Sequence, residues 1–162
     1  MYVGRIVAVG RNASGAACGL YRVSSRSFPN REARILENSV AILPKPGHED
    51  DIYKTPYIAY NCVKLVGNHA VVTNGSHTDF IAEKIAAGLS PRDALSTVLL
   101  AMDYEHDSYN TPRIAAVIDN EATACLGIVT DQSLLVTAID YGELTPGERT
   151  HVANVVVHVD GQ

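Results

Sequence analysis

The stretch NGSHTDFIAEKIAAGLSPRDALSTVLLAM, residues 74–102, decides the fold class because its apolar side chains recur at helical spacing. One face of a first predicted helix carries Phe80, Ile81, Ile85 and Leu89. Gly88 favours a stop, and Ser90 and Pro91 then fit the cap and the first position of a second helix, with Asp93 third. The apolar face of this second helix carries Leu95, Val98, Leu99 and Met102.

Segments with strand character lie on both sides of this helix pair. The predicted strands before it are 2–9, 19–23, 39–43, 57–66 and 70–73, and those after it are 113–118, 122–129, 134–139 and 148–158. Gly67-Asn68 predicts a tight hairpin, and residues 45–56 a surface excursion. Consecutive strands with tight turns favour antiparallel sheets, so the order predicts an α+β protein. Two stacked sheets with helices outside would use every element.

Composition limits the classes of protein. The 162 residues fit one domain, 1–162, and a hydrophobic fraction of 46% supports a sizeable core. The net charge of -5 argues against a general nucleic-acid binder, and no apolar run reaches the ~20 residues of a membrane span. The N-terminus lacks a cleavage-site pattern, and three widely spaced cysteines predict neither a zinc site nor disulfides. We therefore expect a cytoplasmic protein.

Positive charge is nevertheless gathered in one segment. Arg22, Arg26, Arg31 and Arg34 fall within thirteen positions. The planar guanidinium donates two parallel hydrogen bonds to phosphate or carboxylate. This cluster keeps an anionic small molecule open as a ligand, despite the negative net charge.

Four segments resemble a known family: YRVSSRSFPNR at 21–31, NGSHTD at 74–79, DYE at 103–105 and YNTPR at 109–113. Together they closely resemble the archaeal IMP cyclohydrolase family, over nearly the whole chain. The resemblance implies a four-layer αββα sandwich, similar to N-terminal nucleophile hydrolases, with the active site between two mainly antiparallel sheets. Those hydrolases use Thr, Ser or Cys at position 1. Met1 and Tyr2 cannot serve in this way, which fits a family that kept the fold without the nucleophile.

The resemblance also implies the reaction. The substrate would be 5-formamidoimidazole-4-carboxamide ribonucleotide (FAICAR), which loses water as its second ring closes to give inosine 5'-monophosphate (IMP) in the last step of de novo purine biosynthesis. Glu105 is our candidate for proton transfer and Arg31 for the donor that holds the carboxamide oxygen. Tyr60 could orient a substrate carbonyl. Without the resemblance, these residues could equally be a solvated helix-end acid, a surface or phosphate-binding arginine and a core tyrosine.

Further polar residues are candidates for substrate binding. Ser24, Ser25 and Arg26 form a plausible phosphate or ribose turn, and the segment before the first helix offers backbone N–H groups to a phosphate. An ordinary turn, capped by Ser76 or Thr78, is the alternative for the second segment. The complete predicted binding set is Arg22, Ser24, Ser25, Arg26, Asn61, Asn74, Gly75, Ser76, His77, Asn110, Thr111 and Arg113.

We expect neither a metal nor another cofactor. Asp103, Glu105, His106 and Asp107 are close together but lack the spacing of known metal motifs, and ring closure needs no metal. The expected partners are FAICAR and IMP, with no nucleic acid and no membrane, and a homo-oligomer remains open. The alternative functions are a non-catalytic purine-nucleotide-binding protein of the same fold, an amide hydrolase of that fold, and a subunit of a proteasome-like shell.

Overall fold

A computed structural model describes residues 4–12, 15–24, 28–55, 57–120 and 123–140. Two antiparallel sheets and two α-helices make up this part of the chain. β1 (Arg5–Arg11) and β2 (Ala17–Val23) form the smaller sheet. The larger sheet has seven strands in sequence order: β3 (Arg31–Ile35), β4 (Ser39–Pro44), β5 (Tyr60–Val66), β6 (His69–Thr73), β7 (Arg113–Asp119), β8 (Thr123–Val129) and β9 (Leu134–Asp140).

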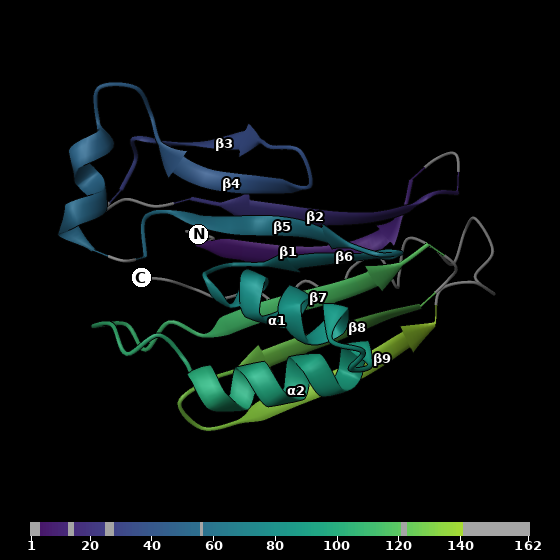
Figure 1. The fold of residues 1–162 in the computed structure, drawn as a ribbon. Helices are drawn as coiled ribbons and strands as arrows, with labels where there is room; N and C mark the ends of the chain where they lie inside the picture. The colour runs from purple at the N-terminus through teal and green to yellow at the C-terminus, as the bar shows by residue number, and fades with distance from the viewer. Residues whose placement is uncertain (1–3, 13–14, 25–27, 56, 121–122, 141–162) are drawn as a thin grey trace.

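The helices connect β6 to β7 and cover one face of the larger sheet (Figure 1). α1 spans His77–Ala86, and α2 spans Pro91–Met102. The predicted boundary between them is confirmed, because Gly88 takes a φ of 95° and the Ser90 side chain accepts a hydrogen bond from the Asp93 N–H. None of the helices in the described residues is long and apolar enough to cross a membrane.

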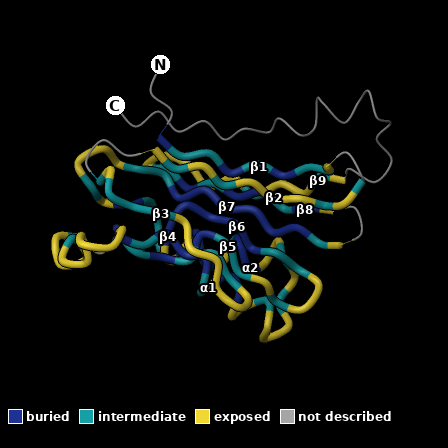
Figure 2. The backbone as a smooth tube through the Cα atoms, turned by 90° about the horizontal axis from the view of Figure 1, so that it is seen from above, coloured by how far each residue is buried: buried dark blue, intermediate teal, exposed yellow. Residues whose placement is uncertain are grey.

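The core has two layers, one on each face of the larger sheet (Figure 2). β7 lies between them and is buried along nearly its whole length. On one face, α1 and α2 pack against β6, β7 and β8. The packing is close at Gly127, where an added Cβ would lie 2.6 Å from Leu99 Cδ1. On the other face, Val7 and Val9 of β1 pack against Val72 and Ile114. The expected α+β class with two antiparallel sheets is confirmed.

Most predicted strands are present, with corrected bounds. The strand expected from residue 57 begins at Tyr60, and Gly67-Asn68 forms the expected two-residue turn, with Gly67 at a φ of 57°. β3 was not predicted. The excursion at 45–56 contains a short 3-10 helix, η1 (Glu49–Lys54). Met1, Tyr2 and the strand predicted at 148–158 lie outside the described residues.

Candidate functional site

Several strands of the two sheets begin at the same end of the molecule (Figure 1). Alternate strands of an antiparallel meander run in the same direction, so β3, β5 and β7 all begin at this end. Their first residues are Arg31, Tyr60 and Arg113. Arg5 begins β1, which packs against β7 from the smaller sheet. Residues far apart in the sequence are therefore brought together by strand direction alone.

Glu105 lies in the loop that follows α2 and is buried. Its side chain is 2% exposed, with Oε2 2.9 Å from Arg5 Nη1 and Oε1 3.6 Å from Arg113 Nη1. Asp103, at a φ of 55°, turns the chain after the helix, and the Glu105 N–H donates to the Thr111 carbonyl oxygen over 2.8 Å. The interpretation of Glu105 as a solvated helix-end acid is therefore wrong. Two guanidinium groups compensate its buried charge.

Tyr60 is buried beside two cationic side chains. Its hydroxyl shares a 2.6 Å hydrogen bond with the Tyr21 hydroxyl from β2. Burial raises the pKa of Tyr60, although Tyr21 and the nearby charges of Arg5 and Arg31 oppose the shift. Burial also raises the pKa of Tyr21 well above its usual value. Both phenols are thus neutral near pH 7 and can act as hydrogen-bond donors rather than as bases.

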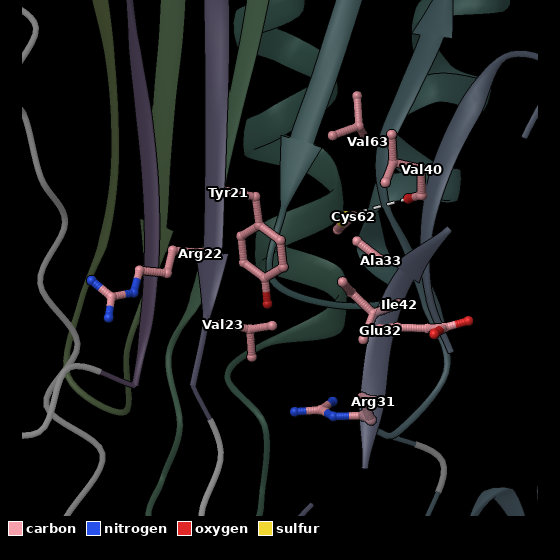
Figure 3. Close-up of a pocket in the computed structure, with 10 residues that line it drawn as sticks. All are labelled: Tyr21, Arg22, Val23, Arg31, Glu32, Ala33, Val40, Ile42, Cys62 and Val63. Atoms are coloured by element: carbon pink, nitrogen blue, oxygen red, sulfur yellow. Dashed lines mark hydrogen bonds between the residues drawn. The ribbon is translucent and has the colours of Figure 1, made fainter. Parts of the chain in front are cut away.

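Arg31 is held by backbone oxygens. Its Nε donates to the Phe28 carbonyl over 3.3 Å, and its Nη1 donates to the Ile58 carbonyl over 3.4 Å. It also lines a cavity of about 390 Å³ between β2 and strands β3, β4 and β5 (Figure 3). Tyr21, Val23, Ile42 and Cys62 line the cavity as well. Such a cavity, apolar with a few polar groups at its border, suits a flat ring that carries polar substituents.

The segment before α1 is firmly bonded to the rest of the protein. The Asn74 amide accepts from the Ile114 N–H and donates to the Pro112 carbonyl, each over 2.9 Å. His77 is fully buried, with Nε2 3.1 Å from the Ile114 carbonyl oxygen, and burial lowers its pKa to about 3. Ser76 is exposed and makes no capping bond through its side chain. Ser76 thus occupies the N-cap position of the alternative interpretation without its side-chain bond, and the Thr78 hydroxyl donates to the Asn61 and Gly75 carbonyls instead.

Other predicted residues lie apart from this cluster. Asn61 is on the opposite face of β5 from Tyr60, where its amide contacts Asp79 of α1 at 3.0 and 3.1 Å. Arg22 is exposed and points away from the cavity, although it borders it (Figure 3). Ser24 is exposed after β2, while Ser25 and Arg26 lie outside the described residues.

The loop before β7 is organised by acidic residues. Asp107 accepts hydrogen bonds from the Thr111 N–H over 2.9 Å and from its hydroxyl over 2.7 Å. Asn110 is exposed, and its amide donates to Asp131 over 3.3 Å. Arg113, by contrast, is buried and donates from Nε to the Asp103 carbonyl over 2.8 Å. Of these three predicted residues, Arg113 lies closest to the Glu105 carboxylate, whereas Thr111 contacts Glu105 only through its backbone carbonyl.

Two residues of the cluster, Arg5 and Tyr21, were missed in the sequence. A signal existed for each. Arg5 stands two positions before Val7 in β1, so it shares the buried face of that strand, and Tyr21 shares a face with Val23 in β2. A charged side chain on the same strand face as buried valines needs a buried counter-charge. In the described residues, no group of three or more His, Cys, Asp or Glu side chains is placed to hold a metal ion.

Fold and site together define a two-sheet α+β protein with a buried, arginine-paired carboxylate and a cavity between β2 and strands β3, β4 and β5. Comparison with known proteins identifies the family to which the chain belongs. Residues 2–154 match the model of the family described as IMP cyclohydrolase-like protein. The chain therefore belongs to the IMP cyclohydrolase family.

Similar archaeal proteins bear the name IMP cyclohydrolase. The one from Methanosphaera stadtmanae is 50% identical over 143 residues, covering 88% of this chain and 70% of its own length. The one from Methanococcus maripaludis strain C6 is 53% identical over 154 residues, covering 94% and 74%. The one from Methanocaldococcus jannaschii is 50% identical over 141 residues, covering 86% and 67%.

Proposed function

We propose that the chain is an IMP cyclohydrolase, which closes the ring of FAICAR to give IMP in purine biosynthesis. The observation that carries this proposal is the cluster at the strand starts. A buried carboxylate, Glu105, lies between Arg5 and Arg113. The charges of Arg5 and Arg31 in turn act on the Tyr60 hydroxyl. About 50% identity to archaeal proteins of that name supports the same activity.

The reaction needs one proton acceptor and one electrophilic donor. The carboxamide nitrogen of FAICAR attacks the formyl carbon, a C–N bond forms, and the nitrogen loses a proton to Glu105. The formyl oxygen takes up this proton, returned by Glu105, and a second proton that the formamido nitrogen gives up. The C–O bond breaks and water leaves, so the balance is FAICAR to IMP plus H₂O. Arg31 donates to the carboxamide oxygen and favours its imidate form, while Tyr60 orients a carbonyl of the substrate.

Glu105 has little contact with solvent in this structure. Its side chain is 2% exposed, and the side chain of its partner Arg5 is 17% exposed. We propose that Arg5 shifts when the substrate reaches Glu105. Because both reacting groups belong to one molecule, the protein mainly selects a conformer and supplies the proton transfer.

The cavity beside Arg31 is our candidate for the base and ribose of the nucleotide. Ser24 directly follows Val23, which lines that cavity, so we propose that the polar sequence Ser24-Ser25-Arg26 receives the 5'-phosphate. The segment before α1 is a weaker candidate, because the Gly75 N–H already donates to the Thr73 hydroxyl and the His77 ring is buried. Asn61, bonded to Asp79, is the least suited of the predicted binding residues.

The finer fold assignment also belongs to this proposal. We infer a single domain with the four-layer αββα sandwich of N-terminal nucleophile hydrolases. The support is the order of layers in the described residues, where the helix pair, the larger sheet and the smaller sheet are stacked one on another. Cys18, Cys62 and Cys125 are unpaired thiols, which fits the proposed cytoplasmic location.

A turnover assay with purified protein tests the function. We expect conversion of FAICAR to IMP without added metal, folate or ATP, and the same rate after treatment with EDTA. Activity that is lost with the chelator and restored by a divalent ion would contradict the metal-free mechanism. Binding of IMP without any turnover would favour the non-catalytic nucleotide-binding alternative.

A further inference from the structure

Two buried polar atoms beside Glu105 have no hydrogen-bond partner among the described residues. They are His77 Nδ1 and Arg113 Nη1. His77 Nε2 lies 3.1 Å from the Ile114 carbonyl oxygen, which can only accept, so Nε2 carries the hydrogen and Nδ1 is an acceptor. Arg113 Nη1 lies 3.6 Å from Glu105, beyond hydrogen-bond distance. Buried polar groups nearly always have a partner, so both atoms call for one.

The unpartnered atoms and the Glu105 carboxylate are neighbours around the Gly75 backbone. A Cβ added to Gly75 would lie 3.2 Å from Glu105 Oε1, 3.2 Å from His77 Nδ1 and 3.4 Å from Arg113 Nη1. The three atoms are thus close enough to one another for a single small molecule beside Gly75 to bridge them.

The chemistry of the three atoms selects the ligand. Glu105 Oε1 and His77 Nδ1 accept hydrogen bonds, whereas Arg113 Nη1 donates. The missing partner must therefore donate two hydrogen bonds and accept at least one, and it must be small. Water meets this condition, while an ammonium ion cannot accept and a carboxylate cannot donate.

We propose that one water molecule binds between His77, Glu105 and Arg113 and holds the Glu105 carboxylate in the orientation for proton transfer. The catalytic part of this inference rests on the proposed function. The water donates to Glu105 Oε1 and to His77 Nδ1, and accepts from Arg113 Nη1. His77 is thus a positioning residue, which acts on Glu105 through the water and touches no reacting atom.

A matched pair of variants separates this role from simple packing. In His77→Gln, the side-chain amide can replace Nε2 and keep the bond to the Ile114 carbonyl, but the Nδ1 acceptor is lost. In His77→Asn, the side-chain oxygen can replace Nδ1, but the bond to Ile114 is lost. Urea unfolding midpoints, kcat and KM are measured for both variants and for the wild type.

We expect His77→Gln to lose at least about tenfold in kcat with KM and the unfolding midpoint close to wild type. His77→Asn should lose more stability and retain more kcat than His77→Gln. The reverse order of kcat would overturn the positioning role and leave His77 as a packing residue that pins α1 to β7.

A crystal structure of the wild-type protein tests the site independently of activity. We expect one ordered water within hydrogen-bond distance of Glu105, His77 and Arg113, and its absence from His77→Gln. A direct hydrogen bond between Glu105 and His77, with no water, would overturn the inference. If the wild type binds the water but does not turn over FAICAR, the proposed function fails while the water site stands.

Discussion

Replacing Glu105 by glutamine tests the buried ion pairs and the catalytic role in one variant. The carboxylate lies 2.9 Å from Arg5 and 3.6 Å from Arg113, and glutamine leaves both guanidinium groups without a counter-charge. Breaking a buried pair from one side costs ~3–5 kcal/mol, and the amide oxygen retains one acceptor, so we expect the free energy of unfolding to fall by about 3 kcal/mol. For a chain of this size, Tm should fall by roughly 6–12 °C.

Urea unfolding and single-turnover kinetics on the same preparation check both effects. Turnover should fall by roughly a hundredfold, the usual scale for loss of proton transfer. Glu83→Gln is the matched control, since Glu83 is exposed on α1 and its replacement should change stability by less than about 0.5 kcal/mol. Equal stability of the two variants would refute the burial argument. Near-normal turnover by folded Glu105→Gln would refute the assignment of the base.

Three further predictions concern neighbouring residues. Arg31→Lys cannot bond both the Phe28 and Ile58 carbonyls, so kcat should fall about tenfold, a loss of ~1.4 kcal/mol in transition-state stabilisation. A change confined to KM would make Arg31 a binding residue only. Tyr21→Phe leaves the buried Tyr60 hydroxyl without its 2.6 Å partner, so urea unfolding should show a free energy of unfolding lower by ~1–2 kcal/mol. The double variant with Tyr60→Phe should recover part of this loss, and no recovery would argue against the hydroxyl pair. Burial lowers the pKa of His77 to about 3, so below an unfolded-state pKa of about 6.5 protons favour the unfolded chain. Stability should therefore fall by up to ~1.4 kcal/mol per pH unit as the pH decreases toward about 3, and urea unfolding of His77→Gln should show a shallower slope.

The helices could be predicted from the sequence because their signals are local. Ser90, Pro91 and Asp93 specify the start of α2 within four residues, and Gly88 supplies the positive φ that ends α1. β3 gave no such signal. Its residues Arg31–Ile35 are mostly exposed at the edge of the sheet, where polar side chains are common and hydrophobic alternation is absent.

The candidate site was only partly predictable for a different reason. Arg31, Tyr60 and Glu105 came from the family resemblance, but the burial of Glu105 depends on Arg5, which lies 100 positions away. Neither sequence periodicity nor capping rules contain information on such a distant pair. The separation of Asn61 from Tyr60 was predictable, since adjacent residues of a strand point to opposite faces of the sheet.

The direction of the strands also places the connections between them at two opposite ends of the sheets, and the two ends differ in how well they tolerate inserted residues. The turns β3–β4 and β5–β6 lie at the end of the larger sheet remote from Glu105. Surface turns accept added length at little cost in free energy, because loop-closure entropy grows only slowly with length. The turn at Gly67-Asn68 is thus a suitable place to insert a peptide tag or a fluorescent reporter without disturbing catalysis. The same insertion after Asp103 would displace Glu105, the proton acceptor that we propose.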